Sequence, residues 1–345
     1  MSVRGKSPDK GGRLPPRLTG YIQLQAGEWS IVARKDRLEA ARAFLGPLPV
    51  ESLLRLTGAY GARRRSSPRV GRGATVTVDA GDGRRFVVKA LRRGGLPSRL
   101  RGGLYGRARL LAEMAILEEA HRRGLPTAAP AFGAVGRTRE GREAAVLATE
   151  EIPDAVNLTH RLSSPALSPP ERRSRRAALR AAGAAVRHAH DLGLNHADLN
   201  TGNILVGGAR HAESAWVIDL GVSKLGAPLA SGRRASNLVR LLRSAEKHLG
   251  REPGRLRDAV AFLRGYLAGS AERALAREEG AAETVPRATI SPARGRTEAR
   301  VDAASAPAPT MGDRRIFRRD LLRAIRRRVS LLALHRLGWF LTSRA

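Results

Sequence analysis

The sequence predicts an α+β fold, with a small β-rich N-terminal lobe followed by a mainly helical C-terminal lobe. Two observations support this prediction. Between residues 75 and 149, short apolar runs alternate with turn residues, as strands do, and enclose one helical pattern. From residue 171 onward the apolar and alanine positions recur mostly at helical spacing. The chain has 345 residues, enough for one large domain or two modest ones.

The β-rich half is expected to contain two strand pairs and one helix. The predicted strands are residues 75–78, 86–88, 131–135 and 144–149, and the predicted helix is 107–123. Residues 79–83 are rich in Asp and Gly, which favours a tight turn between the first two strands. The helix is expected to end at Gly124, because a glycine followed closely by Pro126 is a common stop pattern.

The second half is expected to be helical, with two short strands. The predicted helices are residues 171–192, 237–249 and 256–267, and the predicted strands are 204–206 and 217–218. The domain prediction is an N-terminal extension at 1–66 that is partly disordered, an N-lobe at 67–150, a C-lobe at 151–276, a flexible linker at 277–312 and a basic amphipathic tail at 313–345. Residues 21–66 carry apolar segments, with a helical pattern near 37–45, and their sequence does not indicate a role.

The composition is strongly basic. The net charge is +32, with 57 arginines and six lysines among the 63 basic residues. Codon bias in a GC-rich genome produces part of such an excess, but a surplus of this size favours anionic partners. The chain has no cysteine, which excludes disulfides and thiolate metal sites. Residues 1–17 show no secretory signal and no run of 18 apolar residues occurs, so we expect a cytoplasmic protein, soluble or peripheral to a membrane.

One segment carries a specific chemical pattern. Residues 196–203 have the form H-x-D-L-x-x-x-N, and residues 219–221 have the form D-x-G. Phosphoryl transfer needs a carboxylate to orient the attacking hydroxyl and oxygen ligands for Mg²⁺ on the nucleotide phosphates. Asp198 fits the first role, and Asn203 and Asp219 fit the second. A polar turn between two strands is the simpler alternative, but three of the five asparagines of the chain fall within residues 195–203. The pattern therefore predicts a bilobal, protein-kinase-like phosphotransferase that uses ATP and Mg²⁺.

Such a site also needs a cation on the nucleotide phosphates. Lys89 ends an apolar strand pattern and has the form of that lysine, although a solvated strand lysine is the alternative. Glu113 is its expected partner, with Glu118 and Glu119 as competitors. A loop over the phosphates is expected at Gly71 and Gly73, because backbone amides approach phosphate where side chains are absent; an ordinary surface turn remains open. His196 is expected to brace the loop by hydrogen bonding.

Four stretches together carry a family resemblance. They are H-A-D-L-N at residues 196–200 with N-I-L at 203–205, R-R-G-G-L at 92–96, G-L-P at 124–126 with Pro130, and N-L-V-R-L-L-R-S at 237–244. With these motifs, the sequence resembles the 3-deoxy-D-manno-octulosonic acid (Kdo) kinases of Gram-negative bacteria, in the lipopolysaccharide-kinase family, over roughly residues 69–270. The resemblance implies ATP-dependent phosphorylation of a Kdo hydroxyl on lipid A-linked sugar at the cytoplasmic face of the inner membrane.

The charge distribution agrees with an anionic glycolipid acceptor such as Kdo-lipid A. Residues 84–109 contain nine basic residues and no acidic one, and arginine binds carboxylate and phosphate groups well. In residues 313–345, ten arginines outnumber two aspartates, and apolar residues recur at helical spacing. This tail is expected to bind an anionic membrane surface peripherally, or alternatively to pack on the C-lobe. No nucleic acid is expected as a partner, because no recognised binding module is present.

Two other functions remain open from the sequence. A serine/threonine protein kinase is favoured by Asp219-Leu220-Gly221, but no Ala-Pro-Glu follows to close an activation segment. A pseudokinase scaffold is the third possibility. The presence together of Lys89 and Asp198 with the two metal-ligand candidates disfavours it, because a non-catalytic fold does not need all four.

Overall fold

The protein is represented by a computed structural model, which describes residues 14–58, 75–80, 83–92, 103–163, 168–207, 214–249 and 255–268, together with Arg319 and Arg323. The expectations for Gly71 and Gly73, for the linker at 277–312 and for nearly all of the tail at 313–345 therefore lie outside the described residues. The chain divides into two compact units, one made of residues 1–155 and 217–225 and the other of residues 156–216 and 226–345.

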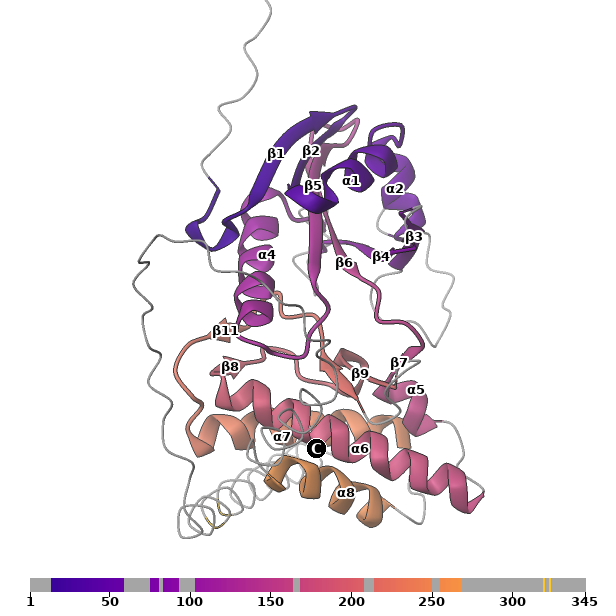
Figure 1. The fold of residues 1–345 in the computed structure, drawn as a ribbon, viewed down its shortest axis with the longest axis vertical. Helices are drawn as coiled ribbons and strands as arrows, with labels where there is room; N and C mark the ends of the chain where they lie inside the picture. Colours follow the sequence, from indigo (N-terminus) through magenta and orange to yellow (C-terminus); the bar gives the residue numbers. More distant parts are fainter. Residues whose placement is uncertain are drawn as a thin grey trace, which may run out of the picture. The chain divides into compact units, whose positions relative to one another are not determined.

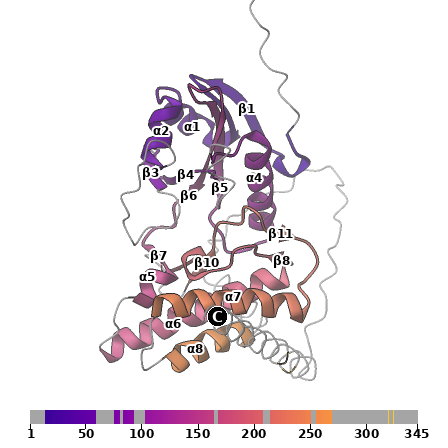
Figure 2. The same ribbon diagram turned by 180° about the vertical axis from the view of Figure 1, so that it is seen from behind.

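The first unit is built on a six-stranded sheet with strand order β1-β2-β5-β6-β4-β3, and its neighbouring strands are antiparallel (Figures 1 and 2). Its elements are η1 Pro16–Leu18, β1 Tyr21–Ala26, β2 Trp29–Arg34, η2 Lys35–Arg37, α1 Leu38–Leu45, α2 Val50–Leu56, β3 Thr75–Asp79, β4 Arg85–Ala90, α4 Arg107–Arg122, β5 Pro130–Arg137, β6 Glu143–Glu150 and β11 Lys224–Leu225. Both predicted strand pairs and the predicted helix are confirmed.

Opposite faces of this sheet pack against different helices, as the two-residue period of strands requires. On β5, Phe132 and Ala134 belong to the core that includes α1 and α2. Gly133 points to the other face, where an added Cβ would lie 2.6 Å from Met114 Sδ of α4. A glycine here lets α4 approach the sheet closely. Figure 1 shows α4 on one side of the strands and α1 and α2 on the other.

The N-terminal segment was predicted to be an extension, but part of it belongs to the main sheet of the first unit. Residues 21–34 form a β-hairpin whose second strand, β2, pairs with β5, so they belong to the main sheet. The turn between the strands uses Gly27, which has φ +56° and whose added Cβ would meet the backbone of Gly46. The hydrophobic core explains why the hairpin is integral, because Trp29 is fully buried and its Nε1 donates to the Leu48 carbonyl oxygen over 2.7 Å.

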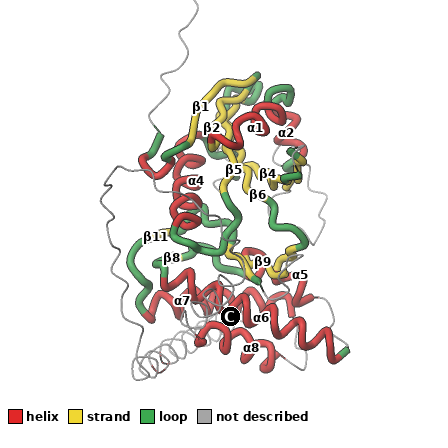
Figure 3. The backbone as a smooth tube through the Cα atoms, viewed as in Figure 1, coloured by secondary structure: helices red, strands yellow, loops and turns green. Residues whose placement is uncertain are grey.

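The second unit is mainly helical (Figure 3). Its elements are β7 Ala155–Asn157, α5 Leu158–Ser163, α6 Pro169–Asp191, β8 Leu194–Asn195, η3 Thr201–Asn203, β9 Ile204–Gly207, β10 Ala215–Val217, α7 Ser231–Leu249 and α8 Arg255–Ala268, with the first residue of β7 and the last of β10 assigned to the first unit. The predicted helices and the two short strands are confirmed, and β9 lies between β10 and β7 in a three-stranded sheet.

Helices α6 and α8 form the main helix pair of this unit. Two glycines allow the close approach: an added Cβ on Gly183 would meet the backbone of Phe262, and one on Gly265 would meet the backbone of Arg180. Helix α6 begins with a capping box, in which Ser168 and Glu171 satisfy each other's backbone N–H groups. These contacts fix the position of α6. They therefore also fix the point from which the next segment, residues 195–203, continues.

Candidate active site

In the first unit, strand alternation directs Lys89 away from the core that contains Phe86 and Val88. Its Nζ lies 2.7 Å from Glu113 Oε1 of α4 and 2.7 Å from Asp219 Oδ1. Arg109 adds a second cation, with its Nη2 3.5 Å from Glu113 Oε2. We call Lys89, Arg109, Glu113 and Asp219 the lysine cluster.

Burial and neighbouring charges shift the pKa of Lys89 in opposite directions. Burial disfavours the ammonium, but the charges and hydrogen bonds of Glu113 and Asp219 more than offset this and raise the pKa of Lys89 above its ordinary value. The Glu113 side chain is only 3% exposed, while that of Lys89 is 29% exposed. The ammonium is therefore fixed by a buried carboxylate and still reaches the surface.

The competing glutamates have other partners. Glu118 accepts a hydrogen bond from the Tyr21 hydroxyl over 2.7 Å, and burial followed by this contact raises the pKa of Tyr21. Glu119 pairs with Arg122 and with Arg123. The helical period explains the selection, because Glu113 lies three residues after the buried Leu110 on the face that packs against the sheet.

The backbone around Asp219 is specialised. Asp219 has φ 60°, in the left-handed region that few non-glycine residues adopt. Leu220 is fully buried, and Val217 N donates to the Pro126 carbonyl oxygen over 2.9 Å. Gly221 lies directly against the cluster, since an added Cβ would be 2.5 Å from Glu113 Oε2 and 2.7 Å from Arg109 Nη2. A side chain at the glycine of the D-x-G pattern would therefore displace the Glu113 carboxylate or the Arg109 guanidinium, a packing role that the sequence did not reveal.

In the second unit, residues 195–203, which we call the polar loop, hold the backbone of Asp198 from both sides. The Asp198 N–H donates to His196 Nδ1 over 3.1 Å, and the buried His196 braces the loop by hydrogen bonding as predicted. The Asp198 carbonyl oxygen accepts from Asn200 Nδ2 over 3.0 Å and from Asn203 Nδ2 over 2.9 Å. The Asp198 residue itself is exposed, and its carboxylate makes no hydrogen bond within the described part of the chain.

The amides of the polar loop also set its local geometry. Asn200 Oδ1 accepts from the N–H groups of Gly202 and Asn203 at the start of η3. Because Asn203 Nδ2 donates to Asp198, its Oδ1 is the atom left to act as an oxygen ligand. The carboxylate of Asp219 and the amide oxygen of Asn203 are both hard oxygen donors, so the chemistry of these residues fits Mg²⁺.

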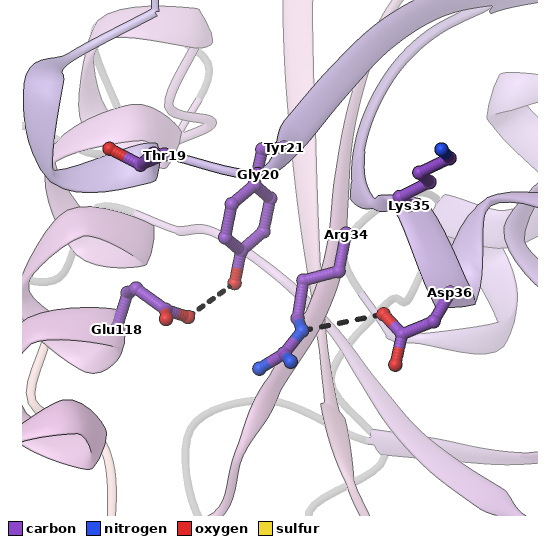
Figure 4. Close-up of a pocket in the computed structure, with 7 residues that line it drawn as sticks. All are labelled: Thr19, Gly20, Tyr21, Arg34, Lys35, Asp36 and Glu118. Carbon is purple, nitrogen blue, oxygen red and sulfur yellow. Dashed lines mark hydrogen bonds and ion pairs between the residues drawn. The ribbon is translucent and has the colours of Figure 1, made fainter. Parts of the chain in front are cut away.

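The described part of the first unit also has a surface hollow of about 610 Å³ (Figure 4). Seven residues line it: Thr19, Gly20, Tyr21, Arg34, Lys35, Asp36 and Glu118. Of the residues that the sequence patterns singled out, its lining contains Glu118 alone, a competitor of Glu113 as the partner of Lys89. The Arg34–Asp36 and Tyr21–Glu118 pairs drawn there already satisfy much of its polar surface.

The β-sheet unit with a strand lysine paired to a helix glutamate, and the helical unit with an H-x-D-L-x-x-x-N loop, define a protein-kinase-like phosphotransferase. Residues 65–266 match the model of the Lipopolysaccharide kinase (Kdo/WaaP) family. This match covers more than half of the chain, and the chain belongs to that family.

Two named kinases with related sequences agree with this assignment. The 3-deoxy-D-manno-octulosonic acid kinase of Actinobacillus succinogenes is 32% identical over 181 residues, which cover 48% of this chain and 72% of the relative. The protein of the same name from Xanthomonas oryzae pv. oryzae is 32% identical over 233 residues, covering 66% and 84%. A solved structure described as WaaP in complex with acyl carrier protein has a TM-score of 0.41 and 26% identity, covering 70% of this chain and 90% of that one. The protein is an enzyme of the kinase class, and the protein-kinase alternative is not favoured.

Proposed function

We propose that this protein transfers the γ-phosphoryl group of ATP to a hydroxyl of Kdo in the lipopolysaccharide inner core, with Kdo-lipid A as the acceptor. The observation that carries the proposal is the match to Kdo kinases, which extends over 84% of the length of the X. oryzae relative. ATP is the donor that membership of a kinase family implies. A protein acceptor has no observation in its favour, because Gly221 has a packing role that is independent of the acceptor.

We assign the roles as follows. Asp198 orients the acceptor hydroxyl and takes its proton, since its carboxylate is exposed on a fixed backbone. Lys89 binds the nucleotide phosphates, with Glu113 holding its ammonium in place. Asn203 and Asp219 would hold Mg²⁺, which when bound neutralises charge on the phosphates. Gly71 and Gly73 stay candidates for the phosphate loop.

The site of action follows from the acceptor. Among the described residues, no helix has both the length and the apolar character needed to cross a membrane. We propose that the protein works peripherally at the cytoplasmic face of the inner membrane, and that residues 313–345 contribute through their basic amphipathic pattern. Deleting residues 313–345 should weaken binding to anionic vesicles; unchanged binding would remove the tail from the proposal.

The acceptor is tested with labelled ATP and purified full-length protein. We expect label on Kdo-lipid A, none on lipid A that lacks Kdo, and none on a general protein-kinase substrate such as casein. An Asp198→Asn variant serves as the matched inactive control. Transfer to casein with no transfer to Kdo-lipid A would overturn the proposed acceptor.

A further inference from the structure

Helix α7 contacts the polar loop through three polar side chains. Asn237, Arg240 and Ser244 are spaced by three and four residues, so they share one face of the helix. Asn237 Nδ2 donates to Asn195 Oδ1 over 3.1 Å, and Ser244 Oγ accepts from Thr201 N over 3.1 Å. Contacts of α7 with β8 and η3 place the helix alongside both ends of the loop.

Arg240 contacts the first half of the loop. Its Nη1 donates to the His196 carbonyl oxygen over 3.3 Å and also to the carbonyl oxygen of Ala197. Ala197 directly precedes Asp198, so the guanidinium is fixed one residue from the proposed base. The site combines a fixed cation with the carboxylate that is proposed to activate the hydroxyl.

Arg240 differs from the other two contacts in exposure and charge. Asn237 is buried and Ser244 is half-buried, whereas Arg240 is exposed. Its only partners in the described part of the chain are neutral carbonyl oxygens, and Nε and Nη2 make no hydrogen bond there. No acidic side chain of the described residues forms an ion pair with it. The loop therefore orients the guanidinium without neutralising it, which a purely structural contact would not require.

We propose that Arg240 binds the carboxylate of the acceptor sugar and so determines which hydroxyl faces Asp198. This inference rests on the proposed function, in which the acceptor is a sugar acid. A guanidinium presents a planar set of donors that matches a carboxylate, and one edge can bind the acceptor while Nη1 stays on the loop. The chemistry recognised is a carboxylate close to the phosphorylated hydroxyl, and Arg240 is a specificity-determining residue.

The test compares Arg240→Gln with Arg243→Gln, a matched control that removes one positive charge from the next turn of α7. Arg243 is exposed and forms no hydrogen bond or ion pair with the polar loop in the described part of the chain. We expect Arg240→Gln to raise the KM for Kdo-lipid A about tenfold or more, the loss typical of a hydrogen bond to a charged group. The KM for ATP should stay within about twofold, and Arg243→Gln should behave like the wild type. Arg240→Lys keeps the charge but loses the planar donor set, so its KM for Kdo-lipid A should lie between the values of the wild type and Arg240→Gln.

A second acceptor separates recognition from loop support. Converting the Kdo carboxylate of the glycolipid to its methyl ester should raise the KM of the wild type by a similar factor. The KM of Arg240→Gln should not change further, because the substitution and the ester each remove the same interaction between Arg240 and the carboxylate. If the two changes are instead additive, or if Arg240→Gln lowers only kcat, the inference is wrong while the proposed function stands. If the wild type fails to phosphorylate Kdo-lipid A, the proposed function fails, and the inference with it.

Discussion

The two units hold their functional groups by different physical means. In the first unit, the lysine cluster fixes a cation with opposite charges, and Glu113 is buried to make this possible. In the second, the polar loop fixes the backbone of Asp198 with neutral hydrogen bonds and leaves its carboxylate exposed. The proposed roles account for this difference, because an ammonium that binds phosphate needs to be charged and anchored, whereas a base needs a fixed position without a competing ion pair. Substitutions should therefore act through charge in the first unit and through geometry in the second.

The largest effect is expected at Asp198. Asp198→Asn should reduce kcat by roughly 10²- to 10⁴-fold, the range for loss of a general base. The melting temperature should not change, because the carboxylate makes no hydrogen bond in the described part of the chain. Steady-state kinetics and thermal unfolding measure the two quantities. A large loss of stability would mean that the side chain supports the loop and that its role as a base needs revision.

The second largest effect is expected from substitution of Lys89. Lys89→Met removes the ammonium 2.7 Å from Glu113 and should lower kcat/KM for ATP by about 10²-fold, through lost phosphate binding. It should also destabilise the protein, because a buried carboxylate loses a partner, although Arg109 stays nearby. Lys35→Met, which removes an exposed lysine of the same unit, is the control. Equal effects of the two substitutions on ATP kinetics would contradict the assignment.

Gly221 tests whether packing holds the cluster. In Gly221→Ala the new Cβ would sit 2.5 Å from Glu113 Oε2, so the Glu113–Lys89 pair must shift. We expect a loss of about tenfold in kcat/KM for ATP, equivalent to about 1.4 kcal/mol and within the usual range for overpacking. Gly226→Ala is the control, since nothing lies within 4 Å of its added Cβ. Wild-type kinetics for Gly221→Ala would show that this contact does not position Glu113.

The smallest effect on activity is expected for a neutral group of the second unit, which acts on stability instead. His190 is buried and its Nδ1 lies 2.8 Å from the Tyr266 hydroxyl. Burial, followed by the charge of Arg234, lowers the pKa of His190 to about 3. The unfolded chain takes up this proton near pH 6.5 and the native state does not, so stability falls as pH decreases from about 6.5 toward 3, by about 1.4 kcal/mol per pH unit.

Urea unfolding at pH 7.5 and pH 5.5 measures this dependence. His190→Gln should flatten the pH dependence and leave activity at neutral pH largely intact, whereas the exposed His160→Gln should retain the wild-type slope. An unchanged slope in His190→Gln would mean that the acid sensitivity arises at other groups.

Much of the fold and part of the candidate site could be predicted from sequence. The strands around residues 75–88, the helix bearing Glu113 and the polar loop all have local patterns that their structure follows. The hairpin at residues 21–34 was missed, although apolar and polar residues alternate over residues 22–25, just before the turn at Gly27. Its place in the main sheet depends on pairing between β2 and β5, which are about a hundred residues apart, and periodicity carries no information on such pairing.

Three site features were not predicted from the sequence. Gly221 and Arg240 act through contacts with residues distant along the chain, whereas Arg109 pairs with Glu113 one helical turn away. In a chain with 57 arginines, neither arginine stands out by type, and a glycine after Asp219 indicates a turn without indicating what it packs against. Residues 217–225 also group with the first unit, although the predicted boundary placed them in the second half. The remaining domain boundaries stay predictions.

The central claim is that this chain phosphorylates Kdo and that Asp198 and Lys89 carry the reaction. The most direct measurement is transfer of labelled phosphate from ATP to Kdo-lipid A, followed by mild acid cleavage of the ketosidic bond and separation of sugar from lipid. We predict that the label stays with the released Kdo, and that Asp198→Asn and Lys89→Met each slow its transfer by about a hundredfold or more. Label that remains on the lipid A part, or transfer at the wild-type rate in both variants, would contradict the account.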